Sequence, residues 1–214
     1  MVKVATPKLD RARVARTALD LLDETGLEGL TLRAIAQRLD VKAPALYWHF
    51  KDKQALLDEM ATEMMRRMGE EFLAAPAADW REALTDAMRR MRGQLLRYRD
   101  GAKVFSGTQY TDLSYAAPLE AFLRTLVAAG FTPGAAARAW FTVYSYTIGY
   151  VIEEQATGPD EGGHDLAARA ERLAAYPLAA AAGEEMFRGH DRGFETGLAA
   201  VVAGIGATLL TSGE

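Results

Sequence analysis

The chain has 214 residues, half of them hydrophobic and a quarter charged, which is enough for a sizeable core in one or two domains and excludes a disordered chain. It has no cysteine, which excludes disulfides, thiolate metal sites and cysteine nucleophiles and fits a reducing compartment. Charged residues interrupt the start of the chain before an apolar run long enough for a signal peptide. The apolar run over residues 198–210 is too short to span a bilayer. We expect a soluble cytoplasmic protein without a membrane partner.

The net charge of −4 hides an asymmetry along the chain. Residues 1–53 carry a balance of +3, whereas residues 54–214 carry −7. The cations near the start face a single acid, Asp10, and are Lys3, Lys8, Arg11, Arg13 and Arg16. This pattern favours nucleic acid as a partner of the front end, although an ordinary solvated helix face explains it equally well.

The first 50 residues have the pattern of three short helices. Apolar spacing predicts an amphipathic helix over residues 9–25 that Gly26 ends. Thr31 is placed to cap a second helix, and after a three-residue break Pro44 opens a third at its permissive first turn. Two short helices joined by three residues indicate a helix-turn-helix, a motif that binds DNA but also occurs as a plain structural corner.

The rest of the chain is predicted to be helical, because no segment alternates as a strand does. Helices are expected over residues 51–72, 80–98, 100–106, 116–129, 133–156, 165–176, 177–187 and 191–210, with a Gly-rich loop over 157–165. The predicted fold is all-α, with a DNA-binding head in residues 1–50 and a helical domain in residues 51–214. Lys51 to about Phe72 forms the connecting helix.

A helix-turn-helix presents the N-terminal end of its second helix to the major groove. In this chain that end consists of the small, apolar residues Ala43, Pro44 and Ala45. They can contact thymine methyl groups but cannot form bidentate hydrogen bonds with bases. Arg33, early on the preceding helix, is our candidate for a guanine O6/N7 pair, because its guanidinium fits two acceptors.

Further polar side chains near these helices are suited to phosphates or sugar edges: Thr31, Tyr47, His49 and Lys53. Thr31 serves as cap and phosphate contact together. We assign the two neighbouring aromatic residues, Trp48 and Phe50, to the core of the head. The aromatic cluster over residues 47–50 is therefore expected to divide between a DNA-facing side and a buried side.

The helix predicted over residues 133–156 carries aromatic side chains around its circumference: Trp140, Phe141, Tyr144, Tyr146 and Tyr150. It is expected to be covered on several sides, so each tyrosine hydroxyl needs a hydrogen-bond partner. A bound ligand and an internal acceptor are both open as that partner.

The last predicted helix has a continuous apolar face formed by Phe194, Leu198, Val201, Val202, Ile205 and Leu209. Exposed on a monomer, such a face would be a liability. We expect it to form a dimer interface with its two-fold mate, while an internal core helix is the alternative.

Two segments resemble a known family. TLRAIAQRLDVKAPALYWHFKDKQALLDEMA, residues 31–61, resembles the DNA-binding head of the tetracycline-repressor family, and LLRYRDGAKVFSGT, residues 95–108, resembles the matching stretch of the tetracycline repressors. The resemblance extends to about Glu153. It implies a homodimeric, all-helical repressor that leaves a palindromic DNA operator when a small molecule enters its C-terminal ligand-binding and dimerisation domain.

The resemblance also locates an effector site and shows how this chain departs from the pattern. Phe105 replaces the histidine that coordinates drug-bound magnesium, Gln109 replaces an arginine, and small or apolar residues occupy other polar positions. Together with two residues of the aromatic helix, the expected effector-binding set is Gly69, Ala87, Met91, Phe105, Thr108, Gln109, Trp140, Tyr144 and Glu153. Because Phe105 cannot bind a metal, we expect no metal, no cofactor and an apolar or aromatic effector other than tetracycline–magnesium.

An enzyme is the rival from another class. The histidines lie far apart in sequence, at His49, His164 and His190, and no HExxH, GxGxxG, GxSxG or P-loop motif occurs. We therefore predict a regulator without catalysis. A helical small-molecule-binding protein that does not bind DNA is a further alternative.

Overall fold

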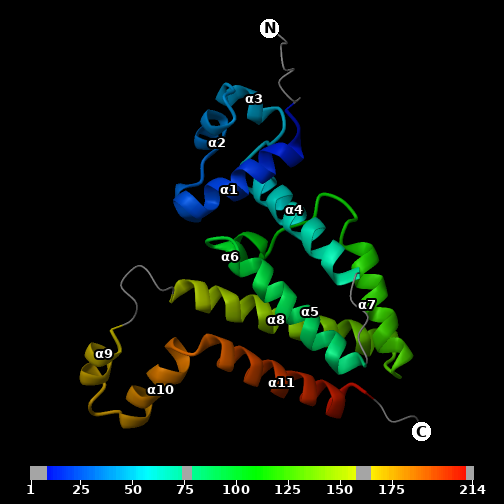
Figure 1. The fold of residues 1–214 in the computed structure, drawn as a ribbon, viewed down its shortest axis with the longest axis vertical. Helices are drawn as coiled ribbons and strands as arrows, with labels where there is room; N and C mark the ends of the chain where they lie inside the picture. The colour runs from blue at the N-terminus through cyan, green and yellow to red at the C-terminus, as the bar shows by residue number, and fades with distance from the viewer. Residues whose placement is uncertain (1–8, 74–78, 158–164, 211–214) are drawn as a thin grey trace.

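The computed structural model describes residues 9–73, 79–157 and 165–210. These ranges contain helices and no strand, so the all-α prediction is confirmed. Figure 1 shows a head of α1, α2 and α3 at one end, from which α4 leads into a larger helical body. The bounds are α1 Arg11–Gly29, α2 Leu32–Arg38, α3 Ala43–Tyr47, α4 Lys53–Leu73, α5 Trp80–Leu96, α6 Gly101–Phe105, α7 Ala116–Ala128, α8 Pro133–Ala156, α9 Leu166–Arg172, α10 Pro177–Phe187 and α11 His190–Thr208.

Capping residues set where the helices of the head begin. Asp10 caps α1, its Oδ1 accepting a hydrogen bond from the backbone N–H of Arg13 at 2.7 Å, so α1 begins two residues later than predicted. Thr31 caps α2 as predicted, with its Oγ1 accepting from the N–H of Ala34 at 3.1 Å. Pro44 lies in the first turn of α3, where a missing N–H breaks no helical hydrogen bond.

One apolar core holds the three helices of the head and the start of α4 together. Its buried side chains include Val14, Ala18, Leu19, Leu22, Leu30, Ile35, Leu46, Phe50 and Leu56. Burial of each large side chain contributes about 1.5–3 kcal/mol. The core therefore fixes the angle between α2 and α3.

Gly26 interrupts α1 with a φ of 67°, a left-handed value that favours glycine. The sequence predicted the helix end here, but the helix resumes and continues to Gly29. A Cβ at Gly26 would lie 3.2 Å from Arg99 Nε and 3.3 Å from Asp100 Oδ2, so the body approaches closely. The backbone N–H of Leu27 donates to Asp100 Oδ2 at 3.0 Å. The break therefore joins the head to the loop between α5 and α6.

Helix α4 passes from the head into the body, where it lies beside α6 and α7 (Figure 1). It begins at Lys53 rather than Lys51, because Asp52 Oδ1 accepts from the N–H of Ala55 at 2.8 Å. Methionines are buried along its length, at Met60, Met64, Met65 and Met68.

The body is built around α8, which packs against α5, α6, α7 and α11. Arg92 of α5 joins three helices, since its Nη2 lies 2.6 Å from Glu154 Oε1 on α8 and 2.7 Å from Asp191 Oδ1 on α11. Its guanidinium also lies 4.9 Å from the ring centroid of Phe194. These contacts fix α11 against the rest of the body.

The hydroxyl groups of two tyrosines of α8 have hydrogen-bond acceptors within the protein. For these two, the partner is therefore an internal acceptor and not a ligand. The hydroxyl of Tyr146 donates to the carbonyl of Phe194 at 3.0 Å, and that of Tyr150 to the carbonyl of His190 at 2.9 Å. A Cβ at Gly197 would lie 2.2 Å from the Tyr146 hydroxyl, so glycine on α11 makes this approach possible.

Helices α9 and α10 form an arm that projects from the body (Figure 1). No residue of α9 is buried. The loop predicted over residues 157–165 falls largely on residues 158–164, outside the described ranges. In the parts of the chain that the structure describes, no helix combines the length and apolar character needed to cross a membrane.

Candidate nucleic-acid interface and ligand cavity

The tip of the head, formed by α2, α3 and the turn after α3, carries the residues expected at DNA. Arg33 is exposed on α2, and Thr31 is exposed although its hydroxyl oxygen caps that helix. At the start of α3, Pro44 is exposed while its neighbours Ala43 and Ala45 are half-buried. The small side chains therefore let the backbone of α3 approach a groove closely.

The structure corrects the assignment of Trp48 to the core. Its side chain is 90% exposed, next to Tyr47 at 60%, whereas Phe50 is completely buried. The backbone N–H of Phe50 donates to the carbonyl of Leu46 at 2.9 Å, and both side chains turn inward, which leaves Tyr47 and Trp48 on the outer surface of the tip. Sequence reasoning missed Trp48, since aromatic residues in a small domain are usually buried.

Lys53 has an intramolecular partner, because its Nζ donates to the carbonyl of Leu27 at 2.8 Å. His49 is half-buried, and its carbonyl accepts from the guanidinium of Arg11. Two lysines that sequence reasoning left out, Lys42 and Lys51, are exposed near the same tip. The tip thus offers hydroxyl, indole, guanidinium and ammonium groups together.

The other early cations contribute less to this surface than the charge pattern suggested. Arg11 Nε lies 2.8 Å from Glu59 Oε2, and Arg16 Nη1 lies 3.9 Å from Glu63 Oε2, both acids on α4. Lys3 and Lys8 fall outside the described residues.

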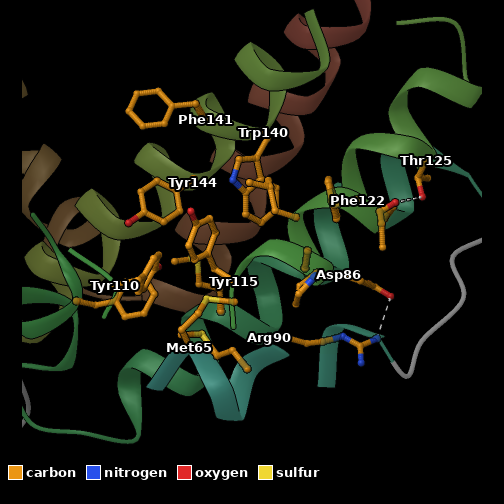
Figure 2. Close-up of a pocket in the computed structure, with 18 residues that line it drawn as sticks. Met65, Asp86, Arg90, Tyr110, Tyr115, Phe122, Thr125, Trp140, Phe141 and Tyr144 are labelled. Atoms are coloured by element: carbon orange, nitrogen blue, oxygen red, sulfur yellow. Dashed lines mark hydrogen bonds and ion pairs between the residues drawn. The ribbon is translucent and has the colours of Figure 1, made fainter. Parts of the chain in front are cut away.

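A cavity of about 760 Å³ lies in the body (Figure 2). Helices α4, α5, α7 and α8 and the segment between α6 and α7 surround it. Its lining is mostly aliphatic and aromatic: Met65, Met68, Ala83, Asp86, Ala87, Arg90, Met91, Phe105, Tyr110, Tyr115, Pro118, Leu119, Ala121, Phe122, Thr125, Trp140, Phe141 and Tyr144. This size and character are typical of a site for an organic ligand.

The structure brings together five of the nine residues expected at the effector, namely Ala87, Met91, Phe105, Trp140 and Tyr144, which all line the cavity. The other four lie outside its lining.

Gly69 backs onto α7, where an added Cβ would lie 3.2 Å from Pro118 Cγ. Thr108 turns its hydroxyl back to the carbonyl of Phe105 at 2.9 Å. Gln109 is exposed, with its backbone N–H donating to Asp58 Oδ1 at 3.1 Å, and Glu153 is exposed on α8.

Sequence reasoning missed the aromatic residues that the α6–α7 segment and α7 contribute. Tyr110 and Tyr115 stack with ring centroids 5.1 Å apart, and Phe105 meets Tyr110 edge-on at 5.9 Å. The ring centroids of Phe122 on α7 and Trp140 on α8 lie 4.7 Å apart. The only sequence signal was the spacing of the two tyrosines in YTDLSY, which has no helical period.

The hydroxyl groups of Tyr110 and Tyr144 make no hydrogen bond with any residue that the structure describes. Burial raises the pKa of Tyr110, and the neighbouring Tyr144 and Tyr115 raise it further. Burial also raises the pKa of Tyr144. Both phenols therefore keep their protons at neutral pH and can donate hydrogen bonds into the cavity.

Asp86 and Arg90 are the charged residues of the lining. Asp86 Oδ2 lies 3.8 Å from Arg90 Nη2, and its Oδ1 lies 3.2 Å from Arg89 Nη1. Arg89 also forms an ion pair with Glu195, with Arg89 Nη2 2.6 Å from Glu195 Oε2. In the described ranges, no group of three or more histidine, aspartate or glutamate residues is placed to hold a metal.

A polar network connects the head with the segment beside the cavity. Glu59 of α4 is only 3% exposed and accepts from Arg11 of α1 at 2.8 Å, from Thr111 Oγ1 at 3.0 Å and from Arg66 at 3.1 Å. Arg66 also bonds Asp112 at 2.7 Å. Thr111 directly follows Tyr110 of the cavity, so the network links cavity wall, α4 and head.

The apolar face of α11 does not lie where the sequence placed it. Four of its six residues, Phe194, Leu198, Val202 and Ile205, are at most 5% exposed because α5 and α8 cover them within one chain. The expected interface is wrong for these four, and they form part of the core instead.

A second, shallow groove lies on the outer side of α8 and α11. It is lined by Ala137, Arg138, Phe141, Thr142, Val201, Gly204, Ile205, Thr208 and Leu209. Val201 and Leu209 of the expected face are half-buried here, and Phe141 is 65% exposed. Phe141 lines this groove and the cavity, so the two share a wall.

A helix-turn-helix head and a largely apolar cavity in a helical body together define a DNA-binding regulator with a ligand-binding domain. The chain matches two family models in tandem: bacterial regulatory proteins of the tetR family over residues 15–60, and the tetracyclin repressor-like C-terminal domain over residues 73–209. The chain belongs to the TetR family of transcriptional regulators.

Individual relatives agree with this membership. The tetracycline repressor protein class A from transposon 1721 of Escherichia coli is 41% identical over 199 residues, 92% of this chain and 91% of the relative. The structure of a possible TetR family regulator from Streptomyces coelicolor A3(2) is similar with a TM-score of 0.81 and 40% identity, covering 92% and 99% of the two chains. A TetR variant from Acinetobacter baumannii AYE in complex with minocycline is similar with a TM-score of 0.76 and 36% identity, covering 96% and 100%.

Proposed function

We propose that the protein is a homodimeric repressor in the cytoplasm that binds a palindromic operator and is released by a small, apolar or aromatic effector other than tetracycline–magnesium. The exposed pair Tyr47 and Trp48 beside Arg33 carries this proposal. A large aromatic surface on a small packed domain needs a partner. The surrounding guanidinium and lysine ammonium groups match a phosphate backbone.

The contacts with DNA divide by chemistry. Arg33 reads a guanine through two hydrogen bonds, and the small residues at the start of α3 meet base edges or methyl groups. The phosphates and sugars are contacted by Thr31, Tyr47, His49 and Lys53, to which the exposed position of Trp48 adds an apolar contact. Lys53 keeps its bond to Leu27 with one proton and has two more for a phosphate.

The nature of the cavity supports the proposed effector. Phe105 is 2% exposed and stands where the resemblance places the metal-binding histidine of the tetracycline repressors. Ala87 and Met91 offer no hydrogen bond to a drug with many hydroxyl groups. The lining therefore suits an organic molecule with a mostly apolar surface.

The proposed dimer uses the outer sides of α8 and α11 and the arm. Phe141 and the groove beside it provide apolar surface on the body, and the arm exposes Tyr176, Leu178 and Met186 at 64%, 86% and 61%. Two heads in such a dimer would enter successive major grooves about 34 Å apart.

The proposal is tested by a gel shift with the DNA upstream of the protein's own gene, at several stated salt concentrations, against random DNA of equal length. We expect a shift that survives competition by random DNA. No specific shift at any salt concentration would contradict DNA binding and favour a helical ligand-binding protein.

A further inference from the structure

The cavity has aromatic walls that are suited to a flat molecule. Tyr110 and Tyr115 stack on each other at 26° between ring planes, and Phe141 and Tyr144 stack at 18°. Trp140 and Phe122 add a third pair, at 55°. Aromatic rings interact best with other rings in offset-stacked or edge-to-face arrangements. A planar ring system gains such contacts from several of these side chains together.

Three tyrosines contribute hydroxyl groups to the lining of the cavity, and two of them, Tyr110 and Tyr144, are mutually close enough to affect each other's electrostatics. The hydroxyls of Tyr110 and Tyr144 have no acceptor among the described residues, in contrast to Tyr146 and Tyr150, whose hydroxyls donate to carbonyl groups of α11. The Tyr110 and Tyr144 hydroxyls both line the cavity, so each can donate to a ligand oxygen, and such a hydrogen bond contributes about 0.5–1.5 kcal/mol. Tyr110, Tyr115 and Tyr144 come together at one part of the cavity in Figure 2.

Thr125, Asp86 and Arg90 of the lining have partners within the protein. Thr125 Oγ1 donates to the carbonyl of Ala121 at 3.2 Å. Asp86 lies between two arginines, Arg89 at 3.2 Å and Arg90 at 3.8 Å, which balances its charge. In Figure 2 the Asp86–Arg90 pair lies apart from the three tyrosines. The lining therefore requires neither a charged ligand nor a metal.

We propose that the cavity binds a planar, fused-ring aromatic molecule with a carbonyl oxygen that accepts hydrogen bonds from Tyr110 and Tyr144. This inference rests on the proposed function, since it names the chemical class of the effector. Tyr110 also connects the ligand with the head, because the next residue, Thr111, donates a hydrogen bond from its hydroxyl group to Glu59 of α4. A ligand held by Tyr110 thus lies one residue from the network that reaches the head.

Two matched tricyclic probes test the inference: 9-fluorenone, which has a carbonyl oxygen, and fluorene, which has a methylene group at the same place. Equilibrium dialysis of the full-length protein gives the Kd of each. We expect 9-fluorenone to bind about three- to tenfold more tightly, as one or two hydrogen bonds allow. Tyr110→Phe or Tyr144→Phe removes a single hydroxyl and should bring this ratio towards one.

Tyr176→Phe is the matched control, because Tyr176 is exposed at the start of α10, outside the cavity lining. It should leave the ratio of the two Kd values unchanged. The inference is overturned if neither probe binds, if wild-type protein binds both equally, or if the ratio stays high in Tyr110→Phe and Tyr144→Phe alike.

The same samples separate this inference from the proposed function. A specific gel shift without any preference for 9-fluorenone leaves DNA binding intact and contradicts the ligand class. A preference that depends on Tyr110 and Tyr144, in a protein that shows no specific shift, supports the ligand class and contradicts the regulator.

Discussion

Arg11 of the head donates a hydrogen bond to the carboxylate of Glu59 on α4 at 2.8 Å. Glu59 is buried, and its other partners are Thr111, which follows Tyr110 of the cavity lining, and Arg66 on α4 itself. Head, connecting helix and cavity segment therefore meet at one carboxylate. A second connection lies at the end of α1, where Asp100 accepts from the N–H of Leu27. A shift of Thr111 in the cavity segment therefore changes the surroundings of Glu59.

Glu59→Gln should lower the free energy of unfolding by about 1–3 kcal/mol at pH 7, since an amide cannot accept all three charge-assisted bonds. Burial alone would raise the pKa of Glu59, but hydrogen bonds from Arg11, Thr111 and Arg66 outweigh it and lower the pKa below its ordinary 4.5. A depressed pKa stabilises the fold above the pKa of the unfolded chain, and this contribution is lost as pH falls through the folded value. The difference between variant and wild type should therefore shrink below about pH 4.5.

Urea unfolding from pH 3 to pH 7, at one protein concentration because a dimer is proposed, measures this difference. Glu120→Gln is the control: Glu120 pairs with Arg124 on the surface at 2.7 Å, and its loss should cost at most about 1 kcal/mol. Equal losses in the two variants, or a difference independent of pH, would show that Glu59 has no special role.

Trp48→Ala should leave the free energy of unfolding within about 0.5 kcal/mol of wild type, because the side chain is 90% exposed. Phe50→Ala, two residues away and completely buried, should cost about 3–5 kcal/mol. Gel shifts with the folded Trp48→Ala protein should show weaker operator binding, since the exposed indole is proposed to contact DNA. If Trp48→Ala lowered the free energy of unfolding as much as Phe50→Ala, this would show that Trp48 packs in the core.

The sequence predicted the helices well wherever a capping residue or a proline marks an end. Thr31 and Pro44 set the starts of α2 and α3, and α8 has the predicted bounds because Thr132 caps it and Pro133 opens it. Apolar spacing supplied the rest, because a helix with one buried face has a period that can be read without tertiary structure.

The errors arise where the outcome depends on packing between distant segments. Trp48 faces outward because Leu46 and Phe50, on either side of it, occupy the buried side of the turn. Glu59 and Thr111 lie 52 positions apart, so neither position indicates its partner. The apolar face of α11 has the same pattern whether α8 or a second chain covers it. Tyr110 lies in an irregular segment, where no period shows its direction.

Arg33→Ala should weaken operator binding by about 1–3 kcal/mol and relax sequence preference, while affinity for random DNA changes little. Arg38→Ala is a matched control on the same helix, since Arg38 is paired with Glu24 in the head. Fluorescence anisotropy with operator and random DNA at one salt concentration distinguishes the two variants. If Arg33→Ala lowers both affinities equally, Arg33 binds phosphate rather than a base.

Tetracycline with magnesium should not release the protein from its operator, because Phe105 offers no metal ligand and Ala87 and Met91 no hydrogen bond. A gel shift titrated with drug at millimolar magnesium measures release, with the Escherichia coli class A repressor and its own operator as the positive control. Release at micromolar drug would show that the apolar lining does not exclude the complex.

Val201→Arg should produce monomers, because Val201 lines the groove between α8 and α11 that is proposed to receive the second copy. A guanidinium buried in an apolar interface without a partner costs several kcal/mol. Ala199→Arg is the control, since Ala199 is exposed on the same helix but does not line the groove. Sedimentation velocity at micromolar concentration should show a dimer for wild type and Ala199→Arg and a monomer for Val201→Arg. A dimer in all three proteins would place the interface elsewhere, whereas wild-type monomers would contradict the homodimer itself.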